Sequence, residues 1–502
     1  MACDYRPLKE EKYRVRITVG GDRLPYHDDA GSPAADLLET KILINSTISD
    51  AKKGARFMCL DIKDHFLATP MEHPEFMKVK CKHIPEDIIK RCNIDSIATN
   101  DGWVHMRIQK GMPGLRQAAI LACKHLRNSM EPHGCTPIPG TVGLWKHNKR
   151  PTIFCLCVDD FGVKCWSKQD AQHLCNAVGA NFRYTVDMEG SNYCGLTLHW
   201  NYRLGYVDTS MPKYIHKTLK RLKYEADKSP QFSPHHFNPI KYSKKGSQQL
   251  VEHKHHKELP KSDIKHIQSI AGSFLYFARA MDYTMLVSLN DIGTTQAKPT
   301  EWTKAQCQQL MDYAATHPNP TVRYYASDMI LTIDSDAAYL VLPQARSRIA
   351  GYHYLSSLPL SPEQSPPLNA PILVLCKTLR TVVSSAAESE TAGVFTNAQL
   401  ALPIRYILQC LGHQQPPTPI KSDNSTTTGF VNNNIHQKRS KSWDMKYHWL
   451  RDKEVQKQIK VYWEKGVQNL ADYFTKHHPT KHHLKMRRMY NFLDNQSQNN
   501  MS

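Results

Sequence analysis

The chain has 502 residues, of which 40% are apolar, so it can bury real cores and, at roughly 150 residues each, predicts about three domains. Its 65 Lys and Arg residues against 46 Asp and Glu give a formal net charge of +19, which favours a polyanionic partner such as nucleic acid or an anionic membrane surface. No apolar run reaches the roughly 18 residues of a membrane span, no signal peptide begins the chain, and the 14 cysteines contain no CxxC pair. We therefore expect a soluble intracellular protein with reduced thiols, without a zinc ribbon.

The first predicted element is a strand over residues 13–19, where Arg14 and Arg16 alternate with apolar or β-branched residues until Gly20 and Gly21. We expect the two arginines on its exposed face, where guanidinium groups can bind the phosphates of a nucleotide or a template. An ordinary charged edge strand is the alternative. Residues 33–50 then recur at helical spacing.

A second strand, from Arg56 to Leu60, ends in the carboxylate Asp61, and the aromatic Phe66 follows five positions later. A core aromatic is the alternative to a functional role for Phe66. Residues 103–108 form another alternating strand, and Gly111-Met-Pro-Gly114 is a turn that opens a helix from about residue 115 to residue 130. Gln117 lies in the first turn of this helix, where backbone N–H groups favour phosphate; a plain loop-to-helix junction is the alternative.

Residues 154–166 read as a strand, a tight turn and a second strand, with Asp159 and Asp160 at the tip. Two adjacent carboxylates on a buried hairpin are costly, because like charges repel and each resists desolvation. A bound divalent cation would remove that cost, whereas an Asp-Asp turn facing water is the alternative. With Asp61 on a neighbouring strand, three carboxylates can hold two magnesium ions roughly 3.5–4 Å apart.

These three segments, Asp61-x4-Phe66, Gly111 to Gln117 and Val158-Asp159-Asp160, resemble in their order the palm motifs of a reverse transcriptase, with wording similar to the copia type of long-terminal-repeat retrotransposon. The resemblance implies an RNA-directed DNA polymerase that uses Mg2+, or Mn2+ as a substitute. The implied metal ligands are Asp61, Asp159 and Asp160.

The resemblance also implies roles around these acids. Phe66 would block the 2′-hydroxyl of an incoming ribonucleotide, Gln117 would face the nucleotide and template, and Arg14 and Arg16 would end the fingers. Asp64 stands where the family usually has Asn, and Cys157 where many relatives have Tyr or Val; neither change removes an acid. Because few residues precede the strand at residue 13, we expect a piece of a longer polyprotein.

The next segments are an amphipathic helix around residues 171–178 and a hairpin over residues 193–210, whose place matches the primer grip of the family. Residues 223–263 are rich in Lys, His, Pro and Ser and predict a linker or thumb loop. Apolar residues at helical spacing then predict helices from residue 264 towards residue 316. These helices would grip a duplex or only bridge two catalytic domains.

The C-terminal part predicts strands over residues 329–333, 348–354 and 372–383, a helix capped by Ser384 and Ser385, a strand into Asp423, helices at 427–432 and 446–455, and a strand over 459–463. This order resembles the RNase H fold, and each acid falls at a strand end or a helix start. The residues similar to the quartet of that family are Asp336, Glu390, Asp423 and Asp472. Such a quartet implies a second two-metal site that hydrolyses RNA in an RNA-DNA hybrid.

Two other acids, Asp334 and Glu388, lie one pleat or one turn from Asp336 and Glu390. We prefer Asp336 because Ser335-Asp336-Ala337 has the wording of the family. We prefer Glu390 because it is the second acid of the pair Glu388 and Glu390. Residues 464–468 contain no catalytic histidine; His448 is a distant substitute, although a surface or packing role is simpler.

Histidine is frequent, with 26 residues in the chain. Two clusters stand out, and we favour solvated basic loops over metal sites for both. The clusters are His253, His255 and His256, and His477, His478, His482 and His483.

Taken together, the sequence predicts a multidomain protein of the α+β and α/β classes, a right-hand polymerase with fingers, palm and thumb followed by an RNase H-like α/β domain. The expected divisions are fingers and palm over 1–222, linker, thumb and connection over 223–320, RNase H-like domain over 321–485, and a disordered polar tail over 486–502. Expected partners are an RNA template, a DNA primer strand, the RNA-DNA hybrid, dNTP and other Pol products such as integrase, in a cytoplasmic virus-like particle or the nucleus. The alternative is a degenerate or host-recruited copy that binds nucleic acid without turnover.

Overall fold

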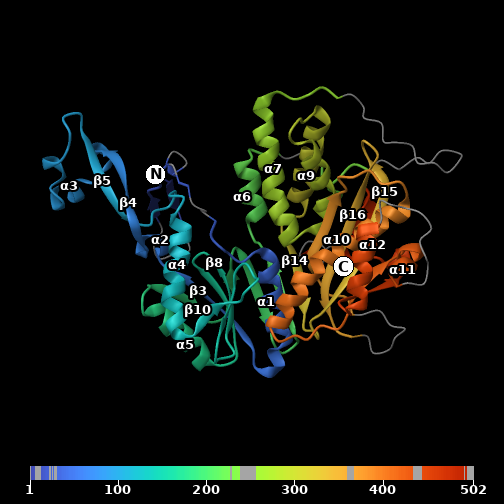
Figure 1. The fold of residues 1–502 in the computed structure, drawn as a ribbon. Helices are drawn as coiled ribbons and strands as arrows, with labels where there is room; N and C mark the ends of the chain where they lie inside the picture. Colours follow the sequence, from blue (N-terminus) through green and yellow to red (C-terminus); the bar gives the residue numbers. More distant parts are fainter. Residues whose placement is uncertain are drawn as a thin grey trace, which may run out of the picture. The chain divides into compact units, whose positions relative to one another are not determined.

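A computed structural model describes residues 2–5, 13–21, 24, 26–27, 31–225, 229–237, 256–358, 367–432, 444–490 and 492–494 (Figure 1). The chain divides into two compact units. Unit 1 comprises Met1–Asp36 and Phe57–Gly190, and unit 2 comprises Leu37–Arg56 and Ser191–Ser502. Unit 2 spans the boundaries expected at residues 222 and 320, which stay predictions.

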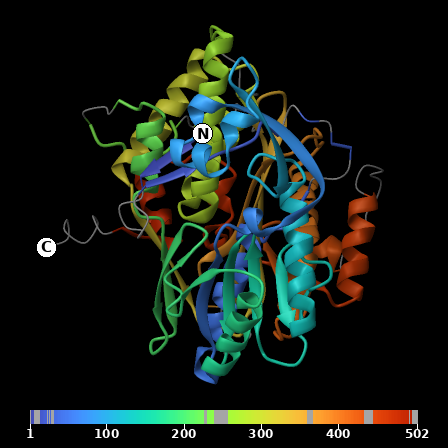
Figure 2. The same cartoon turned by 90° about the vertical axis from the view of Figure 1, so that its left-hand side faces the viewer.

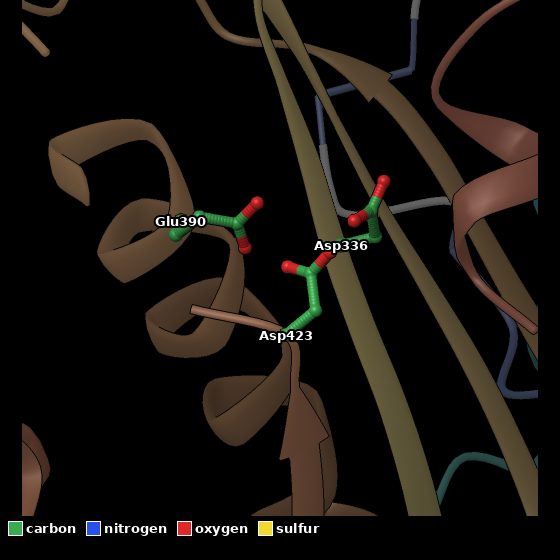
Figure 3. Close-up of side chains that lie close together, drawn as sticks. All are labelled: Asp336, Glu390 and Asp423. Carbon is green, nitrogen blue, oxygen red and sulfur yellow. The ribbon is translucent and has the colours of Figure 1, made fainter. Parts of the chain in front are cut away.

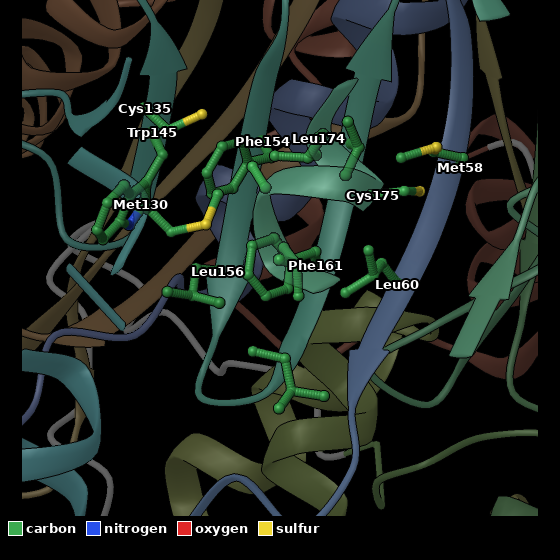
Figure 4. Close-up of a cluster of buried hydrophobic side chains, with 14 of the residues drawn as sticks. Met58, Leu60, Met130, Cys135, Trp145, Phe154, Leu156, Phe161, Leu174 and Cys175 are labelled. Atoms are coloured by element: carbon green, nitrogen blue, oxygen red, sulfur yellow. The ribbon is translucent and has the colours of Figure 1, made fainter. Parts of the chain in front are cut away.

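Unit 1 is built on a six-stranded sheet whose strand order is β10-β3-β9-β8-β7-β6. The strands are β3 (Arg56–Ile62), β6 (Cys135–Pro137), β7 (Leu144–His147), β8 (Ile153–Cys157), β9 (Asp160–Cys165) and β10 (Tyr184–Asp187). Helices α4 (Ala118–Met130) and α5 (Lys168–Gly179) supply apolar faces to the core of this sheet. Figure 4 shows the core, in which Phe154 and Phe161 from the central hairpin meet Leu60, Met130 and Leu174.

The rest of unit 1 extends from this sheet. Strands β4 (Pro70–Lys80) and β5 (Trp103–Lys110) form a long antiparallel ribbon, drawn in light blue in Figures 1 and 2. Short helices α2 (His65–Ala68) and α3 (Glu86–Arg91) flank it, and β1 (Ala2–Tyr5) pairs with β2 (Tyr13–Arg16). The strand expected over residues 13–19 thus ends three residues early, because Val19 turns away and donates its N–H to the Pro113 carbonyl.

Unit 2 contains a five-stranded mixed sheet of order β17-β16-β15-β18-β19. The strands are β15 (Ile330–Leu342), β16 (Arg346–Ser356), β17 (Pro371–Thr378), β18 (Thr418–Ser422) and β19 (Ile459–Trp463). β15 pairs antiparallel with β16 but parallel with β18, and β18 pairs parallel with β19. Helix α10 (Ala386–Cys410) packs on β15 and β16, and α11 (Ser425–Val431) and α12 (Asp444–Val455) lie beside it.

A second five-stranded sheet in unit 2 has the order β11-β12-β13-β14-β20. Its strands are β11 (Asn192–Tyr193), β12 (Leu196–Asn201), β13 (Tyr206–Ser210), β14 (Pro320–Tyr325) and β20 (Phe492–Asp494). The remaining helices are α1 (Leu37–Ser49), α6 (Tyr214–Arg221), α7 (Lys261–Ala280), α8 (Leu286–Thr295), α9 (Glu301–Thr316) and α13 (Thr480–Met489). Much of the linker expected over residues 223–263 lies outside the described residues.

Two sequence predictions are wrong in this region. The strand expected to stop at residue 333 continues to Leu342, because the polar residues that follow pair with β16. The tail expected from residue 486 is ordered over residues 486–490 and 492–494: α13 runs to Met489, Arg487 is buried beside Asp282, and β20 pairs with β14. The helices expected from residue 264 towards residue 316 are confirmed as α7, α8 and α9, with a short turn between α7 and α8.

The second histidine cluster is not a solvated loop. His478 and His483 are buried; the His478 ring stacks on Tyr473, and His483 Nδ1 lies 2.6 Å from the Tyr473 hydroxyl. His477 Nε2 lies 2.6 Å from Asp291 Oδ2. Aromatic packing and polar partners therefore account for these rings. In the first cluster, His253 and His255 lie outside the described residues, and His256 stacks on Trp302.

Within the part of the chain that the structure describes, no helix combines the length and the apolarity needed to cross a bilayer.

Candidate active sites

Three carboxylates from three separate elements of unit 2 converge on one point. Asp336 lies in β15, Glu390 in the second turn of α10, and Asp423 directly after β18. Each offers a carboxylate oxygen, and these oxygens all lie within 4.8 Å of one another; Figure 3 shows the carboxyl groups around a common space. In the described ranges no other set of three His, Cys, Asp or Glu side chains meets that distance.

Local folding explains this convergence. In the parallel pair β15 and β18, Asp334 lies opposite Lys421, so two residues further Asp336 and Asp423 reach the same level. The Ser385 side chain accepts the Glu388 N–H and caps α10, as the sequence predicted, which fixes where Glu390 projects.

Burial and mutual repulsion dominate the electrostatics of this site. Burial, and next the Asp472 carboxylate, raise the pKa of Asp336 to about 7. Burial and then Asp336 raise the pKa of Glu390 well above its ordinary value, and burial with Asp472 also raises the pKa of Asp423. Two buried carboxylates with a third beside them are stable together when protons or a cation neutralise them. Because all donors are carboxylate oxygens, the set fits a hard divalent cation such as Mg2+.

Neighbouring groups hold the carboxylates in place. The Thr475 hydroxyl donates to Asp336 Oδ2 at 2.7 Å, and the Ala337 N–H donates to Glu390 Oε1 at 3.2 Å. Ser422 Oγ lies 3.5 Å from Glu390 Oε2. Thr475 was not predicted as a site residue. Its place in the same turn as Asp472, three residues later, could have indicated that it lies at the site.

Asp472, the fourth predicted acid, begins a short 3-10 helix and lies outside the group of three. The Lys476 ammonium lies 2.5 Å from Asp472 Oδ1. The Asp472 charge nevertheless raises the pKa of Asp336 and of Asp423, so it acts on the same site.

The two alternative acids have other contacts. Asp334 is buried, its Oδ2 accepts the Leu470 N–H at 3.2 Å, and burial raises its pKa to about 7. Glu388 Oε2 accepts both the N–H and the hydroxyl of Ser384, each at 2.8 Å. Neither belongs to the group of three. His448 is exposed on α12 and contacts Tyr447.

The second candidate site lies in unit 1, at the β8–β9 hairpin. Its two-residue turn is Val158-Asp159, and Asp160 begins β9 opposite Cys157. The Ile62 N–H donates to the Asp159 carbonyl at 3.0 Å, which joins the Asp61 strand to the turn. Val158 has φ +63°, a conformation that β-branched residues rarely adopt and that is concentrated at functional sites.

The three palm acids are half-buried and come from neighbouring strands, but among the described residues they do not form a group within 4.8 Å. The hairpin predicted from the sequence is confirmed, and β3, which carries Asp61, neighbours β9 as expected. The roles of Asp61, Asp159 and Asp160 as ligands stay a prediction.

The structure describes two of the four residues that the sequence predicts to contact a nucleotide, Phe66 and Gln117, with their side chains. Phe66 packs on a small core around Ile108 and Leu115, and a Cβ at Gly111 would lie 2.7 Å from the Phe66 carbonyl oxygen. Gln117 precedes α4 instead of lying inside it, and its amide donates to Glu75 Oε1 at 2.8 Å. The side chains of Arg14 and Arg16 lie outside the described residues.

No protein-family model matches the chain. Solved structures with a similar fold include the foamy viral protease-reverse transcriptase with an RNA/DNA hybrid, at 13% identity and a TM-score of 0.44 over 90% of this chain and 48% of that chain. The same foamy viral protein with double-stranded DNA shows 14% identity and a TM-score of 0.43 over 92% of this chain and 77% of that one. An N-terminal RNase H domain from Mycobacterium tuberculosis, fused to maltose-binding protein, shows 10% identity and a TM-score of 0.22 over 32% of this chain and 96% of that one.

The structural neighbours are thus reverse transcriptase and RNase H folds. This chain spans about half of the hybrid-bound foamy viral chain, 48% of its length. With identities of 10–14% and TM-scores below 0.5, these likenesses assign no chemistry to this chain.

Proposed function

We propose that the chain is an RNA-directed DNA polymerase with a C-terminal ribonuclease H that cuts the RNA strand of RNA-DNA hybrids. The observation that carries the proposal is the group formed by the buried Asp336 and Glu390 and the partly exposed Asp423, drawn from three elements of unit 2. A fold gains nothing from two buried carboxylates with a third beside them unless a ligand neutralises their charge.

In the nuclease, Asp336, Glu390 and Asp423 would hold the cation, with Asp472 beside them. Mg2+, or Mn2+ in its place, would when bound supply the positive charge that polarises a phosphodiester and activates its nucleophile. Thr475 and the Ala337 N–H keep two of the carboxylates oriented, and burial of Asp336 and Glu390 limits competing water.

In the polymerase, Asp61, Asp159 and Asp160 would act as the cation ligands at the hairpin tip. The link from the Ile62 N–H to the Asp159 carbonyl keeps the two strands in register, so the acids stay together while a primer end is extended. Phe66 would exclude ribonucleotides, and Gln117, with Arg14 and Arg16, would bind the nucleotide and template.

The finer proposal is a copia-type retrotransposon Pol product. Its partners would be an RNA template, a DNA primer strand, the resulting hybrid and dNTP, and other Pol products such as integrase. The net charge of +19 supports the polyanionic partners. The proposed domain divisions are fingers and palm over 1–222, thumb and connection over 223–320, and an RNase H domain from 321 that extends past residue 485, since α13 runs to Met489.

The test measures Mg2+-dependent dNTP incorporation on a primed RNA template and cleavage of the labelled RNA in the same reactions. We expect the wild-type chain to do both, Asp159→Asn/Asp160→Asn to lose incorporation only, and Asp423→Asn to lose cleavage only. Each loss should reach several orders of magnitude, since the removed carboxylates hold the reacting centre. A wild-type chain that binds the hybrid yet neither extends nor cuts it would establish the binding-only alternative.

A further inference from the structure

An exposed indole lies at the rim of the carboxylate site of unit 2. Strands β18 and β19 run parallel, with Ser422 opposite Trp463. Asp336, Asp423 and Trp463 therefore lie near the same end of three neighbouring strands, β15, β18 and β19. Since adjacent strands are about 4.8 Å apart, the tryptophan is about one strand spacing from Asp423.

A hydrogen bond fixes this indole to the site. Trp463 Nε1 donates to the backbone carbonyl of Asp423 at 3.0 Å, so the only polar atom of the ring is used by the fold. The residue is nevertheless 53% exposed, and Tyr462 and Val467 nearby are 50% and 95% exposed. The indole is a large apolar ring that is held in a fixed orientation, exposed to solvent and next to charged groups. Such a position is typical of an interaction site.

The chemistry of the rim indicates what it contacts. The carboxylates repel phosphates, so a nucleic-acid strand needs contacts beside them that carry no negative charge. Aromatic faces provide such contacts to sugars and bases, independently of sequence. Duplexes of A-like form expose their sugars in a wide, shallow minor groove. With a rise of about 3.4 Å per nucleotide along one strand, the indole lies one or two nucleotides from the position at the carboxylates.

We propose that Trp463 is a substrate contact whose indole face packs against the sugars of an RNA-DNA duplex, one or two nucleotides from the bond held at the carboxylates. The inference rests on the proposed function of that site and adds a residue that the sequence motifs do not include. The competing role is positional: the indole N–H orients Asp423 and the ring contacts nothing.

Two variants of the full chain separate these roles. Trp463→Phe keeps an aromatic face without the N–H, and Trp463→Ala removes both. Tyr406→Ala is the control, since Tyr406 is also exposed but lies sixteen residues, about 24 Å, beyond Glu390 along α10. The measurements are the Kd for a labelled RNA-DNA hybrid without divalent metal, and kcat and KM for cleavage in Mg2+, with melting temperature as the check on folding.

We expect Trp463→Ala to raise Kd and KM roughly tenfold with little change in kcat, and Trp463→Phe and Tyr406→Ala to stay near wild type. An unchanged Kd in Trp463→Ala overturns the proposal. So does an equal fall of kcat in the Phe and Ala variants at constant Kd, which would identify a positioning role. If the wild type binds the hybrid through Trp463 but cuts nothing, the contact stands and the proposed nuclease fails.

Discussion

At the scale of single residues, the carboxylate site depends on a glycine, Gly466, next to Asp423. A Cβ at Gly466 would lie 2.8 Å from Asp423 Oδ2, closer than real Cβ atoms come to other atoms. The short Asp423 side chain cannot yield without moving its carboxylate out of the group of three. Gly466 thus serves the geometry of the site, although no sequence motif singles it out.

Gly466→Ala is therefore expected to slow hybrid cleavage by roughly ten- to a hundredfold, because a misplacement of about 1 Å costs that much. DNA synthesis by the same protein should be unchanged. The readout is the initial rate of RNA cleavage at saturating hybrid, beside dNTP incorporation. Gly272→Ala is the control, since a Cβ at Gly272 meets no described atom within 4 Å. Full cleavage by Gly466→Ala would show that Asp423 can move without consequence.

At the scale of elements, α10 carries Glu390 into the site, and its start is fixed by one cap. The Ser385 hydroxyl accepts the Glu388 N–H, one of the first-turn donors that have no partner inside the helix. Ser385→Ala should lower the free energy of unfolding by about 1 kcal/mol, whereas Ser385→Asp keeps an acceptor and should remain near wild type. Thermal and urea denaturation of the three proteins check this, and equal stability of the Ala and wild-type chains would contradict it.

The same scale shows what a sequence can indicate. The β8–β9 hairpin, the α5 helix and the Ser385 cap follow from local patterns, and all three are present. The length of β15 was not predictable, because its polar residues are kept in a strand by pairing with β16, whose residues come later in the chain. Asp334 and Asp336 share one face of β15, so local pattern could not separate them. Contacts with α10 and β18 distinguish them.

At the scale of the molecule, a segment from the N-terminal part of the chain belongs to the core of unit 2. Helix α1 contacts β14 and β17, and nearly all its residues are buried, including Lys41. The Lys41 ammonium donates to the Arg279 carbonyl at 2.6 Å and to the Tyr283 hydroxyl at 2.7 Å. Burial is the one cause that shifts the pKa of this amine, and no described carboxylate offsets it. Helical periodicity predicted α1 but not that this charge would be enclosed, since its partners lie more than 230 residues away.

This buried amine makes the stability of the whole chain depend on pH. Burial lowers the pKa of Lys41 to about 7 in the folded protein, against 10.5 for an ordinary lysine. Between these two values the unfolded chain binds the extra proton, so the free energy of unfolding should rise with pH, by at most about 1.4 kcal/mol per pH unit. Lys41→Met should remove this rise, and the exposed Lys52→Met should retain it. Urea denaturation at pH 7, 8 and 9 measures the slope, and parallel curves for wild type and Lys41→Met would mean that Lys41 stays charged in the fold.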